Sequence, residues 1–280
     1  MRRKIGIYIM AGFVFLLCYP LIFIVLGSLM GEEELITHLA PVLVPDIQGF
    51  ADWTFFPENW SVEAFQSLLS EDRGYFLHFR NSIKICLGII IGQCLVSVPG
   101  AWAFARYEFW GKRILFSLYI IFMLLPFQVL MLPSYFVLRE LSLLDTLWAI
   151  ISPGVFSTLP VFLLYNFFKG IPEEVIEAGR IDGASEMQLF FRIGVPMGLP
   201  GISAVTVLQF LEYWNIIEQP MIFIEDPVKL PLSFYMPTIQ IENISLALAA
   251  AVVTMLPSYL VFTCGQKSLQ NGIEAISMKK

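Results

Sequence analysis

A charged stretch between two apolar runs holds the side chains best suited to bind a partner protein. It extends from Pro172 to Pro196. Pro172 suits the first position of a helix, because the N–H group that proline lacks would have no helical partner there in any case. The carboxylates that follow would lie at the positive end of the helix dipole: Glu173, Glu174 and Glu177. We expect Glu177 either to make a charge-assisted contact with a basic group of a partner or simply to stabilise this helix end.

A glycine divides the same stretch in two. Gly183 is predicted to end the first helix and to permit a sharp turn, because glycine adopts backbone angles that other residues avoid. A second short helix is predicted over Ala184–Ile193, with Asp182 as its cap and Pro196 closing it. Residues 169–196, named here the knuckle, are thus expected to form a helix–glycine–helix motif on a membrane surface. The alternative is an amphipathic loop without a partner.

Four polar residues recur at three- and four-residue steps near the end of a later apolar run, and so would share one helix face. They are Gln209, Glu212, Asn215 and Gln219. A carboxylate on a membrane helix is costly unless it meets water or a partner. The face therefore either lines a translocation pathway or makes interhelical hydrogen bonds, and the sequence leaves both interpretations open.

Motifs for catalysis, metal binding and nucleotide binding are missing from the chain. There is no HExxH, GxSxG or paired-aspartate motif and no G-x-x-x-x-G-K-[ST] loop. The four cysteines lie in apolar runs without CxxC spacing, which predicts packing residues. We expect neither a metal nor a cofactor on this chain, and no enzymatic activity of its own.

The composition indicates a membrane protein. Of the 280 residues, 57% are hydrophobic and 14% are charged, and the mean hydropathy is +0.73. The net charge of −6 and the dispersed basic residues leave no footprint for nucleic acid. The chain is long enough for several spans in a single membrane domain over residues 1–280.

Six apolar runs are predicted to span the bilayer, each of about 20 or more residues. They are 5–30, 81–105, 114–138, 147–168, 197–224 and 244–264. Pro126 and Pro133 predict bends in the third span, and Gly88 and Gly92 permit close helix contact in the second. The acidic, aromatic segment 31–79 is predicted to lie outside, with a short rim helix near Asn59-Trp60 and Phe65.

Lysine and arginine set the orientation. With six spans, most basic residues fall on one side: Arg2, Arg3, Lys4, Arg106, Lys112, Arg113, Lys169, Arg180, Arg192, Lys267, Lys279 and Lys280. Only Arg73, Arg80, Lys84, Arg139 and Lys229 fall on the other. By the positive-inside rule both termini and the knuckle are cytoplasmic.

The knuckle resembles the EAA loop of permease subunits in bacterial ABC importers. The likeness rests on Glu177-Ala178-Gly179, on Gly183 after three more residues, and on Ile193-Gly194-Val195-Pro196. Two positions depart from that pattern: Gly179 replaces an alanine and Val195 a leucine. The resemblance implies a coupling helix that docks on an ATPase. The coupling residues would be Glu173, Glu174, Glu177, Ala178, Gly179, Asp182, Gly183, Ala184, Ile193 and Pro196.

Further segments are similar to the maltose-type, MalG-like carbohydrate permeases. These are Asn81-Ser82, Ala103–Tyr107, Phe109–Arg113, Leu143–Thr146, Trp214-Asn215 and, more loosely, the tail with Gln266 and Gly272. Glu212 does not belong to that pattern. The resemblance implies an all-α, six-helix permease of the type I importer fold in a bacterial cytoplasmic membrane, most simply for a carbohydrate.

The same resemblance implies the partners. They are a second permease subunit, two cytoplasmic ATPases that hold ATP and magnesium, an extracytoplasmic solute-binding protein and membrane lipid. The binding protein would contact the Glu225–Asn243 loop. Alternatives are an importer for a polyamine or peptide, a proton-coupled secondary transporter, for which no internal repeat is visible, and a non-transport scaffold or intramembrane enzyme.

Overall fold

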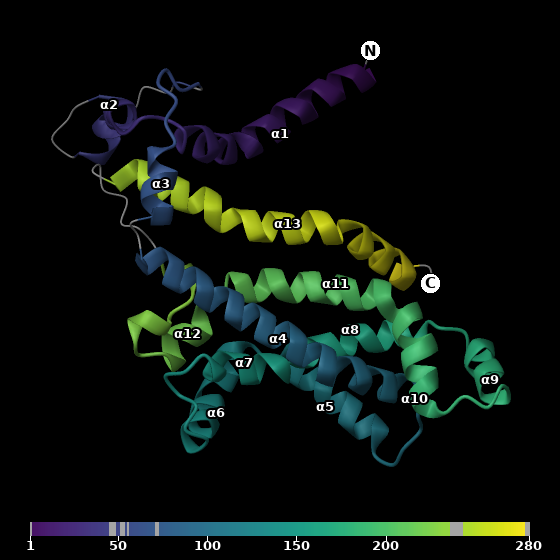
Figure 1. Cartoon of the computed structure of the whole chain (residues 1–280). Helices are drawn as coiled ribbons and strands as arrows, with labels where there is room; N and C mark the ends of the chain where they lie inside the picture. Colours follow the sequence, from purple (N-terminus) through teal and green to yellow (C-terminus); the bar gives the residue numbers. More distant parts are fainter. Residues whose placement is uncertain are drawn as a thin grey trace. The chain divides into compact units, whose positions relative to one another are not determined.

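The computed structural model describes residues 2–44, 49–50, 54, 56–70, 73–235 and 243–277, with side chains from residue 6 to residue 270. The regular secondary structure of the described residues is helical, apart from one isolated bridge between Met30 and Trp60 (Figure 1). It divides into two units: residues 1–76 with 235–257, and residues 77–234 with 258–280. The knuckle belongs to the second unit.

The first unit contains three whole helices and the first parts of two others among the described residues. They are α1 (Arg2–Gly27), α2 (Glu32–Leu43), α3 (Glu63–Ser70), the first part of α13 (Ile244–Ser277) and residues 73–76 of α4 (Arg73–Arg106). Leu35 and Leu39 of α2 pack with Met30 and Ile244. The rim helix predicted near Asn59-Trp60 begins later, at Glu63, and α2 was not predicted. Parts of the predicted outer segment, 45–48, 51–53, 55 and 71–72, lie outside the described residues.

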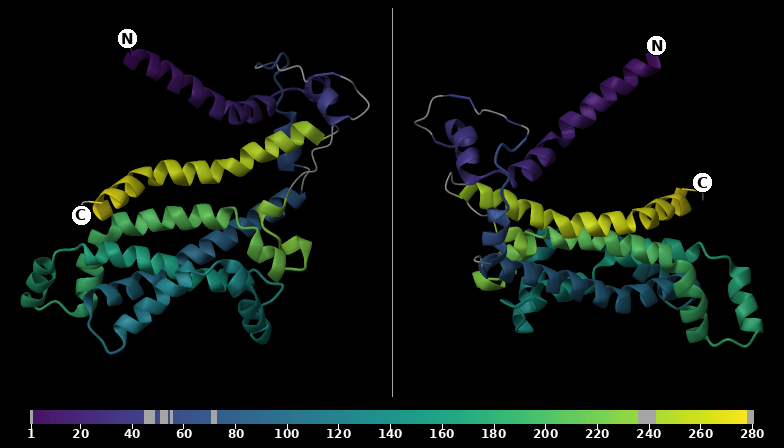
Figure 2. Two further views of the ribbon diagram at one scale, coloured as in Figure 1. Left: turned by 180° about the vertical axis from the view of Figure 1, so that it is seen from behind. Right: turned by 45° about the horizontal axis from the view of Figure 1, so that its top comes forward.

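The second unit contains the rest of α4, the last part of α13 and the remaining helices. The remaining helices are α5 (Lys112–Leu124), α6 (Phe127–Glu140), α7 (Trp148–Val155), α8 (Thr158–Lys169), α9 (Glu173–Ile181), α10 (Glu186–Leu189), the π-helical turn η1 (Phe190–Gly194), α11 (Val195–Trp214), α12 (Glu218–Phe223) and the 3₁₀ turns η2 (Pro227–Lys229) and η3 (Leu232–Phe234). Figure 2 shows α8 and α11 side by side in two further views.

Within the described residues, five helical segments are long and apolar enough to cross a membrane. They are Gly6–Gly27, Arg73–Arg106, Trp148–Lys169, Glu186–Trp214 and Ile244–Gln270. The count becomes six if α5 and α6, which meet at 108°, form one span. The bend falls at Pro126, as predicted, because proline cannot continue the hydrogen bonds of α5. Pro133, in contrast, lies inside α6 and does not interrupt it.

The predicted fifth span, 197–224, is displaced in the structure. Its helix begins at Glu186, and Pro196 does not close the knuckle but lies in the first turn of α11. A proline is tolerated at that position, and the preceding π turn rearranges the backbone bonds there. The helix then ends at Trp214. Asn215 follows it, and its side-chain amide donates to the Leu211 carbonyl.

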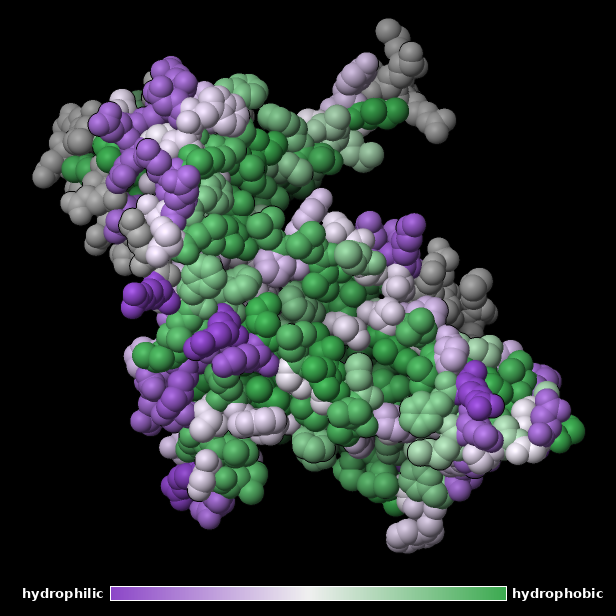
Figure 3. All heavy atoms as spheres, viewed as in Figure 1, coloured by the Kyte–Doolittle hydropathy of each residue, from purple (hydrophilic) through white to green (hydrophobic). Residues whose placement is uncertain are grey.

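Small residues let the helices of the second unit approach closely. Gly88 and Gly92 face Ile151 and Val155 of α7, with no room for a side chain at Gly92. Gly198 and Gly201 of α11 likewise lie against Phe168 and Phe167 of α8, while the indole ring of Trp102 covers Gly194. The close contact predicted for the G-x-x-x-G pair is therefore present. In Figure 3 hydrophobic side chains cover much of the visible face of α4 and α11, and hydrophilic ones gather near α9 and α12.

Candidate docking site for a partner protein

The turn of the knuckle is built from backbone bonds. Gly183 has a φ of +80°, in the left-handed region that favours glycine. The Gly183 N–H donates to the Arg180 carbonyl, and the Ala184 N–H donates to the Gly179 carbonyl, each at 3.0 Å. These two bonds form a Schellman motif, the usual way in which a glycine ends a helix. The predicted role of Gly183 in a sharp turn agrees with this geometry.

The second helix of the knuckle begins with a capping box. The Ser185 hydroxyl accepts from the Gln188 N–H, and the Gln188 side-chain oxygen accepts from the Ser185 N–H. The prediction that Asp182 caps this helix is wrong, because Asp182 is instead the residue that ends α9. Ser185 was missed, although the Ser-x-x-Gln spacing is visible in the sequence.

The inner face of the knuckle continues the hydrophobic core. Ile176 of α9 and Leu189 of α10 are fully buried, in one cluster with Trp102 and Phe168. At Gly179 an added methyl group would lie 2.6 Å from the Leu189 Cδ2 atom. Gly179 therefore allows α9 to approach α10 closely. The knuckle is packed onto the helices behind it.

Ion pairs hold the inner side of the knuckle. The Arg106 Nη1 atom donates to Glu173 at 2.6 Å, and the Arg180 Nε atom donates to Glu186 at 3.2 Å. Glu173 also lies 3.6 Å from Arg180, and the hydroxyl of Tyr107 donates to Glu186 at 2.7 Å. Two of the knuckle's carboxylates are thus occupied by the chain's own cations. Glu186 was not among the predicted residues.

The outer side of the knuckle carries exposed carboxylates and exposed apolar side chains, unlike the ion-paired inner side. Glu174, Glu177 and Asp182 are exposed, and among the described residues their side chains have no hydrogen-bond or ion-pair partner. Beside them the Ile181 side chain is 86% exposed and Met187 is 67% exposed. Ile181 precedes Asp182 and follows Glu177 by one helical turn, and an exposed apolar side chain near carboxylates is suited to a basic partner surface with an apolar pocket.

The other predicted coupling residues are divided between the two sides. Ala178 is exposed on α9, Ala184 and Ile193 are half-buried, and Pro196 is exposed in α11. Ile193 packs on the core cluster and faces Gly179. The structure thus leaves Glu174, Glu177, Ala178 and Asp182 exposed. Glu173 is instead paired on the inner side, and Gly179 faces Leu189. The structure places Ile193 against the core, and Pro196 in the helix that follows.

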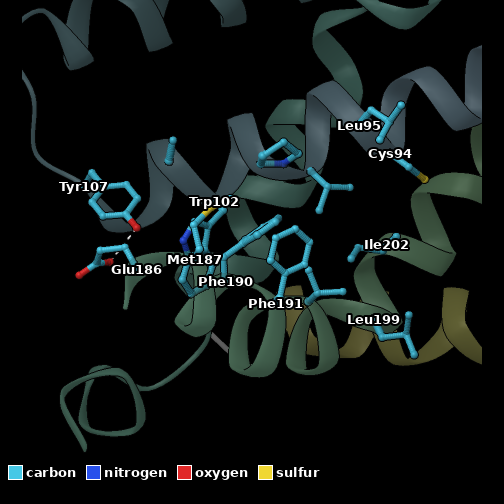
Figure 4. A pocket seen from close by; sticks show the side chains of 14 residues that line it. Cys94, Leu95, Trp102, Tyr107, Glu186, Met187, Phe190, Phe191, Leu199 and Ile202 are labelled. Carbon is cyan, nitrogen blue, oxygen red and sulfur yellow. Dashed lines mark hydrogen bonds between the residues drawn. The ribbon is translucent and has the colours of Figure 1, made fainter. Parts of the chain in front are cut away.

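A groove of about 620 Å³ lies next to the knuckle. Its walls are apolar and come from α4 and from the helix that runs through α10 into α11 (Figure 4). Leu95 and Phe191 face it, and Tyr107 with Glu186 forms its polar end. No sequence motif signalled this groove, because its lining residues are ordinary apolar positions of two helices.

The predicted polar face of α11 is only partly formed. Gln209 is buried and turns toward α4, where its side-chain oxygen accepts from Gln93 at 2.8 Å. Its amide nitrogen donates to Glu212 at 2.9 Å, and Glu212 is exposed. Asn215 follows the helix end, and Gln219 lies in the separate helix α12, so the four residues do not share one helix face. Gln93, missed in the sequence, completes the buried contact.

A second set of polar contacts lies at the opposite end of α4. Asp145, with a φ of +55°, accepts from the backbone N–H groups of Glu225 and Asp226 and from the Lys229 ammonium at 2.6 Å. The bond from Lys229, followed by those from the backbone, holds the pKa of Asp145 below its ordinary value of 3.8. The bond to Asp145 in turn raises the pKa of Lys229.

These contacts fix the first half of the predicted binding-protein loop. The Asn81 amide donates to the carbonyls of Val228 and Leu230, and the Ser82 hydroxyl accepts from the Leu232 N–H. Residues 236–242 of that loop lie outside the described residues. Within the described part of the chain, no three histidine, cysteine or acidic residues come together as a metal site would require.

Comparisons with known proteins agree on one class. The family model for binding-protein-dependent transport system inner membrane components matches residues 85–274. The arabinooligosaccharides transport system permease protein AraQ of Halalkalibacterium halodurans is 28% identical over 272 residues, covering 96% of this chain and 94% of the relative. The diacetylchitobiose uptake system permease protein NgcG of Streptomyces coelicolor is 28% identical over 261 residues, covering 91% and 82%.

A solved structure shows the same fold. It is a chain in the crystal structure of a bacterial ABC transporter involved in the import of the acidic polysaccharide alginate. The two chains overlap with a TM-score of 0.79 at 21% identity, over 94% of this chain and 95% of the other. The predicted all-α fold of an ABC importer permease is thereby confirmed.

Proposed function

The chain belongs to the family of binding-protein-dependent transport system inner membrane components, and we propose that it is a permease subunit that imports a carbohydrate. The relatives named for arabinooligosaccharides and diacetylchitobiose support this cargo class. The chain would act with a second permease subunit, two cytoplasmic ATPases and an extracytoplasmic solute-binding protein in a bacterial cytoplasmic membrane. Both termini and the knuckle would face the cytoplasm.

ATP hydrolysis belongs to the partners in this proposal. The sequence carries no P-loop, so ATP and magnesium would bind to the ATPase subunits. Closure of the ATPases would move the knuckle, and the spans would then switch between inward- and outward-facing states. Such a switch requires partners that bind one state more tightly than the other.

The division of charge on the knuckle carries the proposal. Glu173 and Glu186 are held by Arg106, Arg180 and Tyr107, so the shape of the knuckle does not depend on a partner. The remaining carboxylates and the exposed Ile181 are available to one. The expected partner surface is basic around an apolar pocket, as an ATPase groove for a coupling helix would be.

Two further sites complete the proposal. Glu212, exposed and fixed by Gln209, would contribute a polar contact to the translocation pathway. The loop that Asp145 anchors at Glu225 and Asp226 would contact the solute-binding protein. The assignment of Glu212 rests on its exposure near the end of α11, and that of the loop rests on the predicted orientation.

Purification of the complex tests the proposal. The tagged chain is isolated from membranes in mild detergent, and the proteins that accompany it are identified by mass spectrometry. We expect a second permease and an ATPase, with Ile181→Asp losing only the ATPase. Leu141→Asp, an exposed apolar position beyond α6, is the control and should retain it. Isolation of the wild-type chain without any ATPase would contradict the proposed function.

A further inference from the structure

Arg106 occupies the junction of three helices. It is the last residue of α4, and 5% of its side chain is exposed. One terminal nitrogen, Nη1, donates to Glu173, the first residue of α9. The other, Nη2, donates to the carbonyls of Phe168 at 2.6 Å and Ile171 at 2.5 Å. The guanidinium thus binds the end of α8, the connection after it and the start of α9 at once.

Each acceptor suits a fixed positive charge. Phe168 lies in the last turn of α8, where carbonyl groups lack helical partners and a cation is favoured. The backbone of Ile171 precedes Pro172, which has no N–H group to contribute to this joint. The guanidinium also lies 5.6 Å from the ring centre of Trp102, one turn earlier on α4. Trp102 in turn packs on Phe168.

Lysine could not reproduce this arrangement. The planar guanidinium presents several donors in a fixed fork, whereas an ammonium group is a point charge on a flexible stem. Arg180 does not substitute for it either, because it reaches only Glu173 and Glu186, both within the knuckle. Among the described residues, Arg106 is the cation that joins α4 to both α8 and α9.

We infer that Arg106 is a positioning residue that sets the angle of α9 against α4 and α8, so that displacement of the knuckle is passed to the spans. This inference rests on the proposed function, in which the knuckle receives the ATPase. The contact geometry itself holds whether or not an ATPase is present. Without the guanidinium, α9 would keep its buried Ile176 but could pivot about the joint at residues 170–172.

Distances between two spin labels test the inference without a known cargo. The full-length chain in lipid nanodiscs carries one nitroxide at Cys94, exposed on α4, and one at Ile181→Cys on the knuckle, with Cys18, Cys86 and Cys264 replaced by alanine. Pulsed electron paramagnetic resonance then measures the distribution of label distances. With Arg106 present, we expect one narrow population of label distances. In Arg106→Gln this population should be replaced by a broad distribution.

Two further variants make the result decisive. Arg106→Lys keeps the charge and should also broaden the distribution, and it replaces Arg106→Gln if that variant does not insert. Lys112→Gln removes another basic side chain, at the start of α5, that pairs with exposed Glu108. This variant should leave the distance distribution narrow. An unchanged narrow population in both Arg106 variants would overturn the inference. The proposed function would not be contradicted by that result, provided that the ATPase still co-purifies with the chain.

Discussion

The side-chain amide of Gln93 on α4 donates a hydrogen bond of 2.8 Å to the side-chain oxygen of Gln209 on α11. Gln93 also donates to the Gly154 carbonyl of α7 at 2.9 Å. Both glutamines are buried. A polar pair therefore fixes the register of three helices inside an otherwise apolar bundle, where an unpaired amide would be costly.

Replacement of Gln209 by leucine should destabilise the protein by about 1–3 kcal/mol, because Gln93 loses an acceptor in a buried site. The double variant Gln93→Leu/Gln209→Leu should lose less than the sum of the two single variants, since the residues act as a pair. Thermal unfolding of the purified chain in detergent measures all three. Additive losses would show that the pair is not coupled.

Glu212 should be accessible to water if it lines the pathway. In a chain without its native cysteines, Glu212→Cys should react with a membrane-impermeant methanethiosulfonate reagent. Val207→Cys, buried on the same helix, should not react. Reaction rates are followed by gel shift. A Glu212→Cys side chain as unreactive as that control would place the carboxylate against a partner helix or lipid instead.

Gly183→Val should abolish import without preventing insertion of the chain. At a φ of +80° a side chain costs about 1–2 kcal/mol, and a β-branched one is the least tolerated. Gly183→Asn should be nearly normal, because asparagine enters the left-handed region most readily. Uptake of radiolabelled arabinooligosaccharide or diacetylchitobiose, the cargoes of two relatives, measures the effect. Normal uptake by the valine variant would contradict the role of the turn in coupling.

Charge reversal at Glu177 should weaken binding of the ATPase. The loss of a charge-assisted contact costs about 1.5–3 kcal/mol, which corresponds to at least a tenfold weaker complex. Glu177→Arg is compared with Glu108→Arg, an exposed carboxylate between α4 and α5, by the amount of ATPase that co-purifies. Equal recovery with both variants would exclude Glu177 from the interface.

The anchor at Asp145 should depend on pH in a defined direction. Its pKa is lowered on folding, so its contribution to stability is complete above pH 3.8 and is lost as the pH falls through the lowered pKa. The pKa of Lys229 is raised from 10.5, so its contribution is complete below that pH and is lost above it. Amide exchange is itself pH-dependent, so the quantity to compare is the protection factor, and the protection factors of the amides in residues 225–230 should fall at both extremes.

Two substitutions separate the charge of Asp145 from its backbone bonds. Asp145→Asn tolerates the positive φ and can still accept from the Glu225 and Asp226 N–H groups, so it should abolish most of the pH dependence but only modestly speed exchange. Asp145→Ala loses every bond that the carboxylate makes, keeps only the backbone bond from residue 145 to the Phe223 carbonyl, and should expose the segment. Protection in the alanine variant equal to that of the wild type would show that other contacts hold the segment.

The sequence predicted an all-α membrane protein, the knuckle and its glycine turn, because these depend on composition and on local residue spacing. It misplaced features that depend on tertiary contacts. Pro196 was predicted to end a helix, yet the helix continues past it, because the π turn before it connects α10 directly to α11. Glycine is a weak helix former, and only the proximity of Leu189 shows why Gly179 occupies its position in α9. The glutamine pair joins residues 116 positions apart, which no local pattern signals.

The knuckle's turn closes on its own backbone and its own caps, so its form does not depend on the residues that it displays. If these residues dock on an ATPase, as proposed, substitutions at Glu174, Glu177 or Ile181 should change which ATPase the subunit binds and leave the fold of the turn unchanged. Transfer of only these exposed residues to the permease of another importer should therefore be enough to exchange the ATPases of the two transport systems.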